Sequence, residues 1–193
     1  MLALGLSACT APSTPMKPEG KTEISDSVME TAPIQPDSDL SEGELPLWFI
    51  EELKDINSGM FFKMTDFKGK VILVETMAVW CPKCLTQQQE IAKLKTSFAD
   101  RDDFVSIGID IDPNENEALL ASHVTKYGFD WTFTIASKSV IDEISALYGA
   151  QFLNPTATPM LIIDKQGNQH LLPFGIKTAQ ELQKAVQPFL DAE

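Results

Sequence analysis

Residues 71–84 read VILVETMAVWCPKC, an apolar run that ends in two cysteines three positions apart. The continuous β-branched stretch at residues 71–74 is typical of a strand that is buried on both faces. Residues 85–98 carry apolar side chains on one helical stripe, with glutamines and lysines between them. This pattern predicts a central strand that leads directly into a helix, with Cys81 and Cys84 at the junction.

The sequence on both sides of this junction alternates between strand and helix patterns. Upstream, apolar stretches at residues 48–53 and 60–63 flank the turn residues 57–59, Asn-Ser-Gly, and predict an N-terminal β-hairpin. Downstream, residues 104–111 predict a second buried strand, and Asn114 is the expected N-cap of the helix that follows.

The C-terminal half continues this alternation. Residues 131–135 predict a short strand, and the helical stripe at residues 140–148 ends at Gly149, which suits a C-cap. Residues 160–164 and 170–174 flank a turn and predict an antiparallel hairpin.

A last helix is predicted by the capping box that Thr178 forms with Glu181, and Pro188 is expected to kink this helix or end it early. The complete pattern predicts an α/β fold, in which a central mixed sheet is flanked by helices.

The cysteine pair is placed for thiol-disulfide chemistry. Unpaired N–H groups and the helix dipole stabilise a thiolate at Cys81, and Cys84 lies one turn further in. Pro82 costs no hydrogen bond at the first helical position, and Lys83 adds a positive charge. We therefore expect an exposed nucleophile at Cys81, with a pKa of about 3.5–7.5, and a resolving thiol at Cys84.

A zinc site is the main alternative for a C-x-x-C motif. A structural zinc needs about four ligands, and the sequence holds neither a second C-x-x-C nor a pair of histidines at ligand spacing. His123 and His170 are the two histidines, and we interpret both as structural. The redox-active cysteine pair is expected to work without a metal or another cofactor.

Four stretches taken in order resemble the thioredoxin superfamily, and most closely the TlpA/ResA/DsbE-like thiol reductases of the bacterial cell envelope. They read DFKGKVILV at 66–74, WCPKC at 80–84, YGA at 148–150 and TPMLIID at 158–164. The resemblance covers roughly residues 46–190. It implies a thioredoxin-like fold in which Trp80 precedes the redox pair.

The same resemblance implies roles for three further residues. Pro159, in the Thr158–Pro159 pair, would be cis and face the redox pair, and the neighbouring backbone would bind substrate as a strand. Glu75 would be a buried carboxyl group that takes the proton of Cys84; a solvated edge-strand position is the alternative. Pro155 is assigned no role. The family pattern is not kept at residues 76–79 and 151–157, so the substrate preference stays open.

Residues 9–45 have the composition of a disordered tether. Residues 10–46 hold six prolines, and eight acids against Lys17 and Lys21 leave six net negative charges. The whole chain carries a formal charge of -13, which argues against nucleic acid as a partner. The folded domain is therefore expected at residues 46–193.

The N-terminus resembles the end of a bacterial lipoprotein signal. Residues 1–8 are apolar and small, and residues 6–9 read Leu-Ser-Ala-Cys, so Cys9 is the expected site of lipid attachment. The segment has no basic residues and is short for a complete signal, which suggests an upstream start codon. An apolar tail with a chance cysteine is the alternative. The expected location is the extracytoplasmic side of the cell envelope, anchored by the lipid.

These features together predict a thiol-disulfide oxidoreductase. Its expected partners are disulfides of exported proteins, with apocytochrome c as one such substrate, and a membrane electron donor of the thiol-reductase type. A copper-handling assembly factor of the same fold and a non-enzymatic binding domain are the alternatives. A peroxidase is disfavoured because Thr76 to Cys81 lacks the residue pattern of a peroxidatic cysteine.

Overall fold

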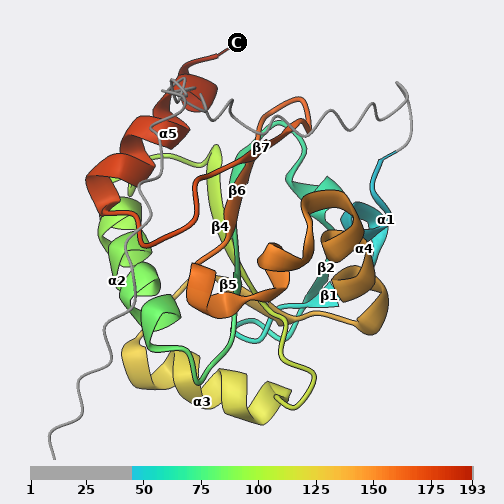
Figure 1. The fold of residues 1–193 in the computed structure, drawn as a ribbon. Helices are drawn as coiled ribbons and strands as arrows, with labels where there is room; N and C mark the ends of the chain where they lie inside the picture. Colours follow the sequence, from blue (N-terminus) through green and yellow to red (C-terminus); the bar gives the residue numbers. More distant parts are fainter. Residues whose placement is uncertain (1–44, 193) are drawn as a thin grey trace, which may run out of the picture. The chain divides into compact units, whose positions relative to one another are not determined.

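The computed structural model of the protein describes residues 45–192 (Figure 1). Cys9, the predicted signal segment and all of the predicted tether except Leu45 lie outside these described residues. The described part folds into a thioredoxin-like arrangement around one mixed sheet. Its strands are β3 (Val71–Met77), β4 (Phe104–Asp110), β5 (Thr132–Ile135), β6 (Met160–Ile163) and β7 (Gln169–Leu171).

The sheet has the strand order β5-β4-β3-β6-β7, which places β3 at its centre. β3 pairs in parallel with β4, and β4 in parallel with β5, whereas β6 runs antiparallel to both β3 and β7. All seven residues of β3 are buried, which confirms the strand predicted from its β-branched run. The antiparallel hairpin is also confirmed, although β7 ends at Leu171, two residues before Pro173.

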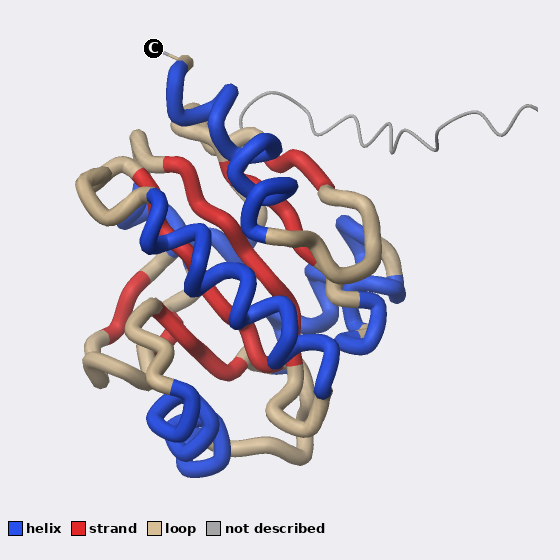
Figure 2. Tube along the Cα trace, turned by 90° about the vertical axis from the view of Figure 1, so that its left-hand side faces the viewer, coloured by secondary structure: helices blue, strands red, loops and turns tan. Residues whose placement is uncertain are grey.

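The helices of the described residues cover both faces of this sheet (Figure 2). They are α1 (Leu47–Ile50), α2 (Pro82–Ser97), α3 (Glu117–Tyr127), α4 (Lys138–Tyr148) and α5 (Ala179–Asp191), with short 3-10 helices at η1 (Met64–Phe67), η2 (Ala150–Leu153) and η3 (Pro155–Ala157). Buried side chains of α2, α3 and α5 form one core cluster with the sheet, and those of α1 and α4 form the other.

The N-terminal segment differs from its prediction in one respect. The predicted hairpin is present as a short antiparallel pair, β1 (Leu53–Lys54) with β2 (Phe61–Phe62). Residues 47–50, however, form the helical turn α1, because Trp48 and Phe49 point into the core from consecutive positions. An extended strand would send these neighbours to opposite faces.

Two helix boundaries also differ from the expected ones. The N-cap of α3 is Asn116, whose side chain accepts the N–H of Leu119, and not Asn114, whose own N–H and amide bond Asp112 in the preceding loop. The capping box of Thr178 and Glu181 is confirmed at the start of α5. Pro188 lies inside α5 without ending it, and the helix continues to Asp191. No helix in the described part of the chain is long and apolar enough to cross a bilayer.

Candidate active site

The two cysteines lie where the central strand β3 passes into α2. Cys81 is the N-cap of α2, and its sulfur accepts a hydrogen bond from the backbone N–H of Cys84 over 3.2 Å. Pro82 occupies the first turn, where a missing N–H costs nothing. Both cysteines are free thiols. The Cys81 sulfur therefore receives one of the unpaired donors that every helix start exposes.

The sulfur positions are more enclosed than the sequence suggested. We expected an exposed Cys81, but both Cys81 and Cys84 are only 1% exposed. The physical reason is the cap itself, because the Cys81 side chain turns inward to accept the N–H of Cys84. Its neighbours Pro82 and Lys83 lie at the surface, and Trp80 is 56% exposed.

The thiol of Cys84 points to the segment between η2 and β6. It donates a hydrogen bond to the carbonyl oxygen of Pro155 over 3.2 Å. Burial is the main cause that raises the pKa of Cys84 above its ordinary value, and the hydrogen bond with Cys81 adds to it. Cys84 is therefore held as a protonated thiol that needs a base before it can attack. Sequence reasoning gave Pro155 no role, since a backbone contact leaves no trace in residue type.

The Thr158–Pro159 pair enters β6 without a cis peptide bond. None of the peptide bonds in residues 45–192 is cis, so the expected cis bond before Pro159 is wrong for this structure. The chain turns instead at Thr158, the C-cap of η3, which adopts the left-handed conformation with φ 48°. Pro159 is buried, and its carbonyl oxygen accepts the N–H of Thr76 at 3.2 Å. The pair thus anchors the segment to the central strand.

Glu75 lies in the middle of β3 and is 3% exposed. The edge-strand alternative therefore does not hold, because β3 is paired on both sides. Burial raises the pKa of Glu75 to about 8, and smaller opposing effects come from the Gln88 amide and the positive charge of Lys177. The charge of Glu75 in turn contributes to the raised pKa of Cys84. A carboxyl group that titrates near neutrality is suited to accept and release a proton.

Several buried polar side chains that lie on α2 or bond to it were not found by sequence reasoning. Gln87 and Gln88 are fully buried on α2, although they look like surface residues in the helical stripe. His123 was predicted to be structural, and its Nε2 lies 2.7 Å from Oε1 of Gln88 in the interior. Lys177, from the loop before α5, is also buried. The available sequence signal was the run of three glutamines at residues 87–89, which begins three positions after Cys84.

A second set of acids holds the loop that precedes Cys81. The Glu115 carboxylate accepts the N–H of Val79 at 2.8 Å and that of Trp80 at 3.3 Å. The Trp80 indole N–H donates to Asp112 over 2.6 Å. Asp110 is fully buried beside them; burial and then the hydrogen bond with Glu115 raise its pKa to about 8. These acids position the Trp80 loop, which the sequence alone did not reveal.

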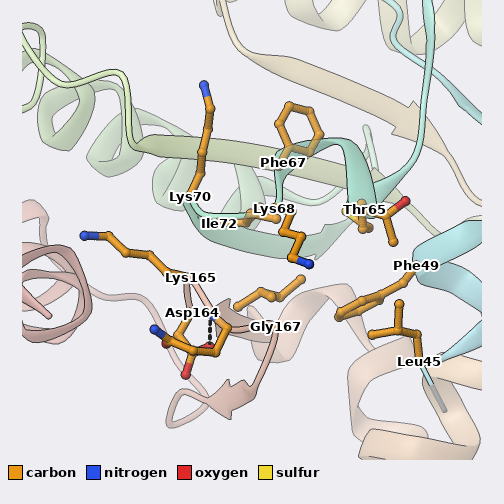
Figure 3. A pocket seen from close by; sticks show the side chains of 13 residues that line it. Leu45, Phe49, Thr65, Phe67, Lys68, Lys70, Ile72, Asp164, Lys165 and Gly167 are labelled. Carbon is orange, nitrogen blue, oxygen red and sulfur yellow. Dashed lines mark hydrogen bonds between the residues drawn. The ribbon is translucent and has the colours of Figure 1, made fainter. Parts of the chain in front are cut away.

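Two cavities lie at opposite ends of the central strand β3. One, of about 170 Å³, lies beside the redox loop and is lined by Trp80, Ile111, Asp112, Pro113, Leu153 and Pro155. The other, also about 170 Å³, opens at the opposite end of β3, where Phe49 and Ile72 form part of an apolar floor (Figure 3). Lys70 and Lys165 point away from this second cavity in Figure 3. The lining of the first cavity includes Trp80, which precedes Cys81, and Pro155, whose carbonyl oxygen accepts a hydrogen bond from the Cys84 thiol.

No group of three His, Cys, Asp or Glu residues in the described part of the chain is arranged to hold a metal ion. His170, the other histidine, bonds Asp164 at 2.8 Å on the far strand β7. The titratable groups at the site are the two thiols and the buried acids Glu75 and Asp110.

Comparison with known proteins places this chain in a family. The Redoxin family model matches residues 50–168, more than half of the chain. No curated protein matches the chain. The chain resembles a thioredoxin-family thiol:disulfide interchange protein from Chlorobium tepidum, with 20% identity over 72% of this chain and 92% of that chain and a TM-score of 0.58.

Two further solved structures share the fold at low identity. One is a secreted Mycobacterium tuberculosis disulfide oxidoreductase homologous to E. coli DsbE, with 18% identity, 72% and 95% coverage and a TM-score of 0.56. The other is a secreted thiol-disulfide isomerase from Corynebacterium glutamicum, with 15% identity, 74% and 84% coverage and a TM-score of 0.61.

The fold, the family match and a dithiol at a helix N-terminus together define the class, a thioredoxin-like thiol-disulfide oxidoreductase. The chain belongs to the Redoxin family.

Proposed function

We propose that this protein reduces disulfide bonds of exported proteins, and that Cys81 is the attacking thiol. The observation that carries the proposal is the hydrogen bond from the Cys84 N–H to the Cys81 sulfur, because it places the Cys81 sulfur at the helix start as an acceptor of a backbone N–H, with Cys84 one turn away. A helix N-terminus favours the thiolate that such a reaction requires.

The reaction proceeds in two exchanges. The Cys81 thiolate attacks one sulfur of the substrate disulfide and forms a mixed disulfide, while the other substrate sulfur leaves as a thiolate. Cys84 then loses its proton to Glu75 and attacks the Cys81 sulfur. The Cys81–Cys84 disulfide forms, and the substrate is released with both cysteines reduced. A donor dithiol returns two electrons to the pair, which needs no other cofactor.

The cellular setting is part of the proposal. Lipid attachment at Cys9 would hold the domain at the membrane of the bacterial cell envelope, on the extracytoplasmic side. A membrane donor of the thiol-reductase type would supply the electrons there. Apocytochrome c fits as a substrate because haem attachment requires reduced cysteines, and the exposed Trp80 lies beside a cavity that a peptide segment can contact.

The direction of electron flow is tested by the reduction potential of the Cys81–Cys84 pair. The full chain, in a Cys9→Ser background, is equilibrated with dithiothreitol or glutathione buffers, and the free thiols are trapped and counted. A potential near about −270 mV supports the reductase, whereas one near about −120 mV identifies an oxidase of exported thiols.

The order of the two cysteines is tested with single variants. Cys84→Ser leaves the attacking thiol in place, so it is expected to accumulate a stable mixed disulfide with a model disulfide protein. Cys81→Ser serves as the matched control and is expected to trap none. Equal trapping by both variants would overturn the assignment of Cys81 as the nucleophile.

A further inference from the structure

Lys177 is a buried lysine in the loop between β7 and α5, with 9% of its surface exposed. Its ammonium donates hydrogen bonds to the carbonyl oxygens of Thr158 at 3.0 Å and Gly175 at 2.6 Å. Lysine is rarely buried without a partner, because desolvation of the charge is costly. The two carbonyl oxygens therefore serve as the partners that the buried ammonium requires.

Hydrogen bonds join the loop around Lys177 to α2, the helix that carries Cys84. Gln87, three residues after Cys84, accepts the Lys177 N–H at 2.7 Å and donates its amide to the Lys177 carbonyl oxygen at 3.0 Å. On the other side, the Gly175 N–H donates to Ala157 over 2.8 Å. Lys177 thus joins α2 to the segment 155–158 that faces the Cys84 thiol.

The hydrogen bond from the Lys177 ammonium to Thr158 acts at a strained backbone position. Thr158 has a positive φ of 48°, which a β-branched residue adopts only when its surroundings hold it there. Its carbonyl oxygen is the acceptor of the Lys177 ammonium. The hydrogen bond therefore helps to hold the turn that sets Pro155, and with it the acceptor of the Cys84 thiol, in place.

The charge of Lys177 also acts on Glu75. Lys177 favours the carboxylate form of Glu75. Burial lowers the pKa of Lys177 to about 8, and Glu75 and Glu181 act against this by favouring its ammonium form. The other polar group that acts on Glu75 is the Gln88 amide, and Glu75 in turn acts on the Cys84 thiol. The ion pairs among residues 45–192 do not include one between Lys177 and Glu75. The charge of Lys177 therefore acts on Glu75 beyond ion-pair distance, in an interior where screening is weak.

We propose that Lys177 is a positioning residue of the redox site, which holds the segment 155–158 against Cys84 and favours the form of Glu75 that accepts the Cys84 proton. This inference rests on the proposed function, because Glu75 takes that proton only in the second exchange. In that step the proton moves from the Cys84 sulfur to a Glu75 oxygen, the Cys84–Cys81 bond forms, and the bond from Cys81 to the substrate sulfur breaks.

The test measures the second exchange by itself. The full chain in a Cys9→Ser background is converted to a mixed disulfide between Cys81 and thionitrobenzoate, and the release of the coloured thiolate reports the attack by Cys84. Its rate is recorded against pH for the parent, Lys177→Met and Lys177→Arg. Because the parent alone shows whether the exchange occurs, failure of the proposed function is separated from failure of the role of Lys177.

We expect the rate to rise with pH as Glu75 loses its proton. Lys177→Met removes a nearby positive charge, so the midpoint should move up by about half a pH unit or more. Lys177→Arg keeps the charge and should stay close to the parent midpoint. In a Glu75→Gln background, Lys177→Met should cause no further displacement. An unchanged midpoint in Lys177→Met, or the same displacement without Glu75, would overturn the proposal.

A second measurement decides the question if Lys177→Met does not fold. Coupling between two charges is reciprocal. The isosteric variant Glu75→Gln should therefore lower the pKa of Lys177 relative to the parent, as followed by the NMR shift of the lysine Cε against pH. A Lys177 titration that is the same in both proteins would show that the two side chains do not interact.

Discussion

The Cys84 thiol donates a hydrogen bond to the carbonyl oxygen of Pro155, a residue 71 positions further along the chain, over 3.2 Å. This contact favours the protonated form of the Cys84 sulfur, and burial also disfavours its thiolate form. The sulfur of Cys81, in contrast, accepts a backbone N–H at the start of α2. The two thiols therefore have opposite hydrogen-bonding roles, which divides the chemistry between them.

This difference predicts that Cys84 is alkylated more slowly in the folded protein than in the unfolded protein. In the reduced, folded protein at pH 7, iodoacetamide should modify Cys84 at least about 100-fold more slowly than in urea, because only the thiolate reacts and the folded pKa is raised. Peptide mapping by mass spectrometry measures the rate at each cysteine. Modification of Cys84 at the same rate in both conditions would contradict the structural assignment.

The carboxylate of Glu115 should stabilise the loop before the redox pair. It accepts the N–H groups of Val79 and Trp80, and hydrogen bonds to a charged acceptor contribute about 1.5–3 kcal/mol each. Glu115→Gln retains one acceptor, so we expect a loss of about 1–2 kcal/mol in the free energy of unfolding by urea. The exposed Glu52→Gln is the matched control and should change little. Equal effects of both would remove the structural role of Glu115.

The order of strands and helices could be predicted because it depends on local sequence patterns. The β-branched run at residues 71–74 marks the central strand, and the Thr178–Glu181 box marks the start of α5. The position of Cys81 at the helix start also follows from neighbouring residues alone. Each of these features depends on a few consecutive side chains, whose preferences act before the chain is packed.

The environment of the site could not be predicted in the same way. Lys177 and Gln87 are 90 residues apart in sequence, yet they form hydrogen bonds with each other. Both are residue types that usually lie at the surface. Asn116 and not Asn114 is the N-cap of α3, because Asn114 donates its N–H to the Asp112 carboxylate in the preceding loop. The left-handed Thr158 replaces the expected cis bond for a similar reason, since its contacts come from distant segments.

Gly108 should be intolerant of a side chain. A Cβ atom at this position on β4 would lie 2.6 Å from the ring of Phe133, its paired neighbour on β5, and 3.4 Å from Oε1 of Glu75. Gly108→Ala should therefore cost about 1–3 kcal/mol in urea unfolding. Combining it with Phe133→Leu should recover part of the loss, because the smaller side chain leaves room. Strict additivity of the two changes would show that they do not meet.

The capping box at the start of α5 should contribute measurably to stability. The Thr178 side chain accepts the Glu181 N–H at 3.2 Å, and the Glu181 carboxylate accepts the Thr178 N–H at 2.8 Å. Thr178→Ala is expected to lower the free energy of unfolding by about 1 kcal/mol. Thr125→Ala, at an exposed position inside α3, is the control and should be neutral or slightly stabilising. A similar loss in both would argue against the cap.

The two buried acids should make the protein less stable as the pH rises from about 5 to 8. Burial raises the folded pKa of Glu75 and of Asp110 to about 8, above the ordinary values of 4.5 and 3.8. The folded state therefore binds more protons than the unfolded state in this range. The stability that each acid contributes is complete below its unfolded pKa, and it is lost as the pH rises through the folded value.

Urea unfolding at several pH values between 5 and 8 measures this loss. Each unit of pKa difference corresponds to about 1.4 kcal/mol, so the parent should lose a few kcal/mol across the range. Glu75→Gln and Asp110→Asn should each flatten the dependence, whereas Glu52→Gln should leave it unchanged. Lys177, whose pKa burial lowers to about 8, affects stability mainly above this range. A slope that neither acid variant reduces would mean that both acids are already ionised in the folded protein at pH 5.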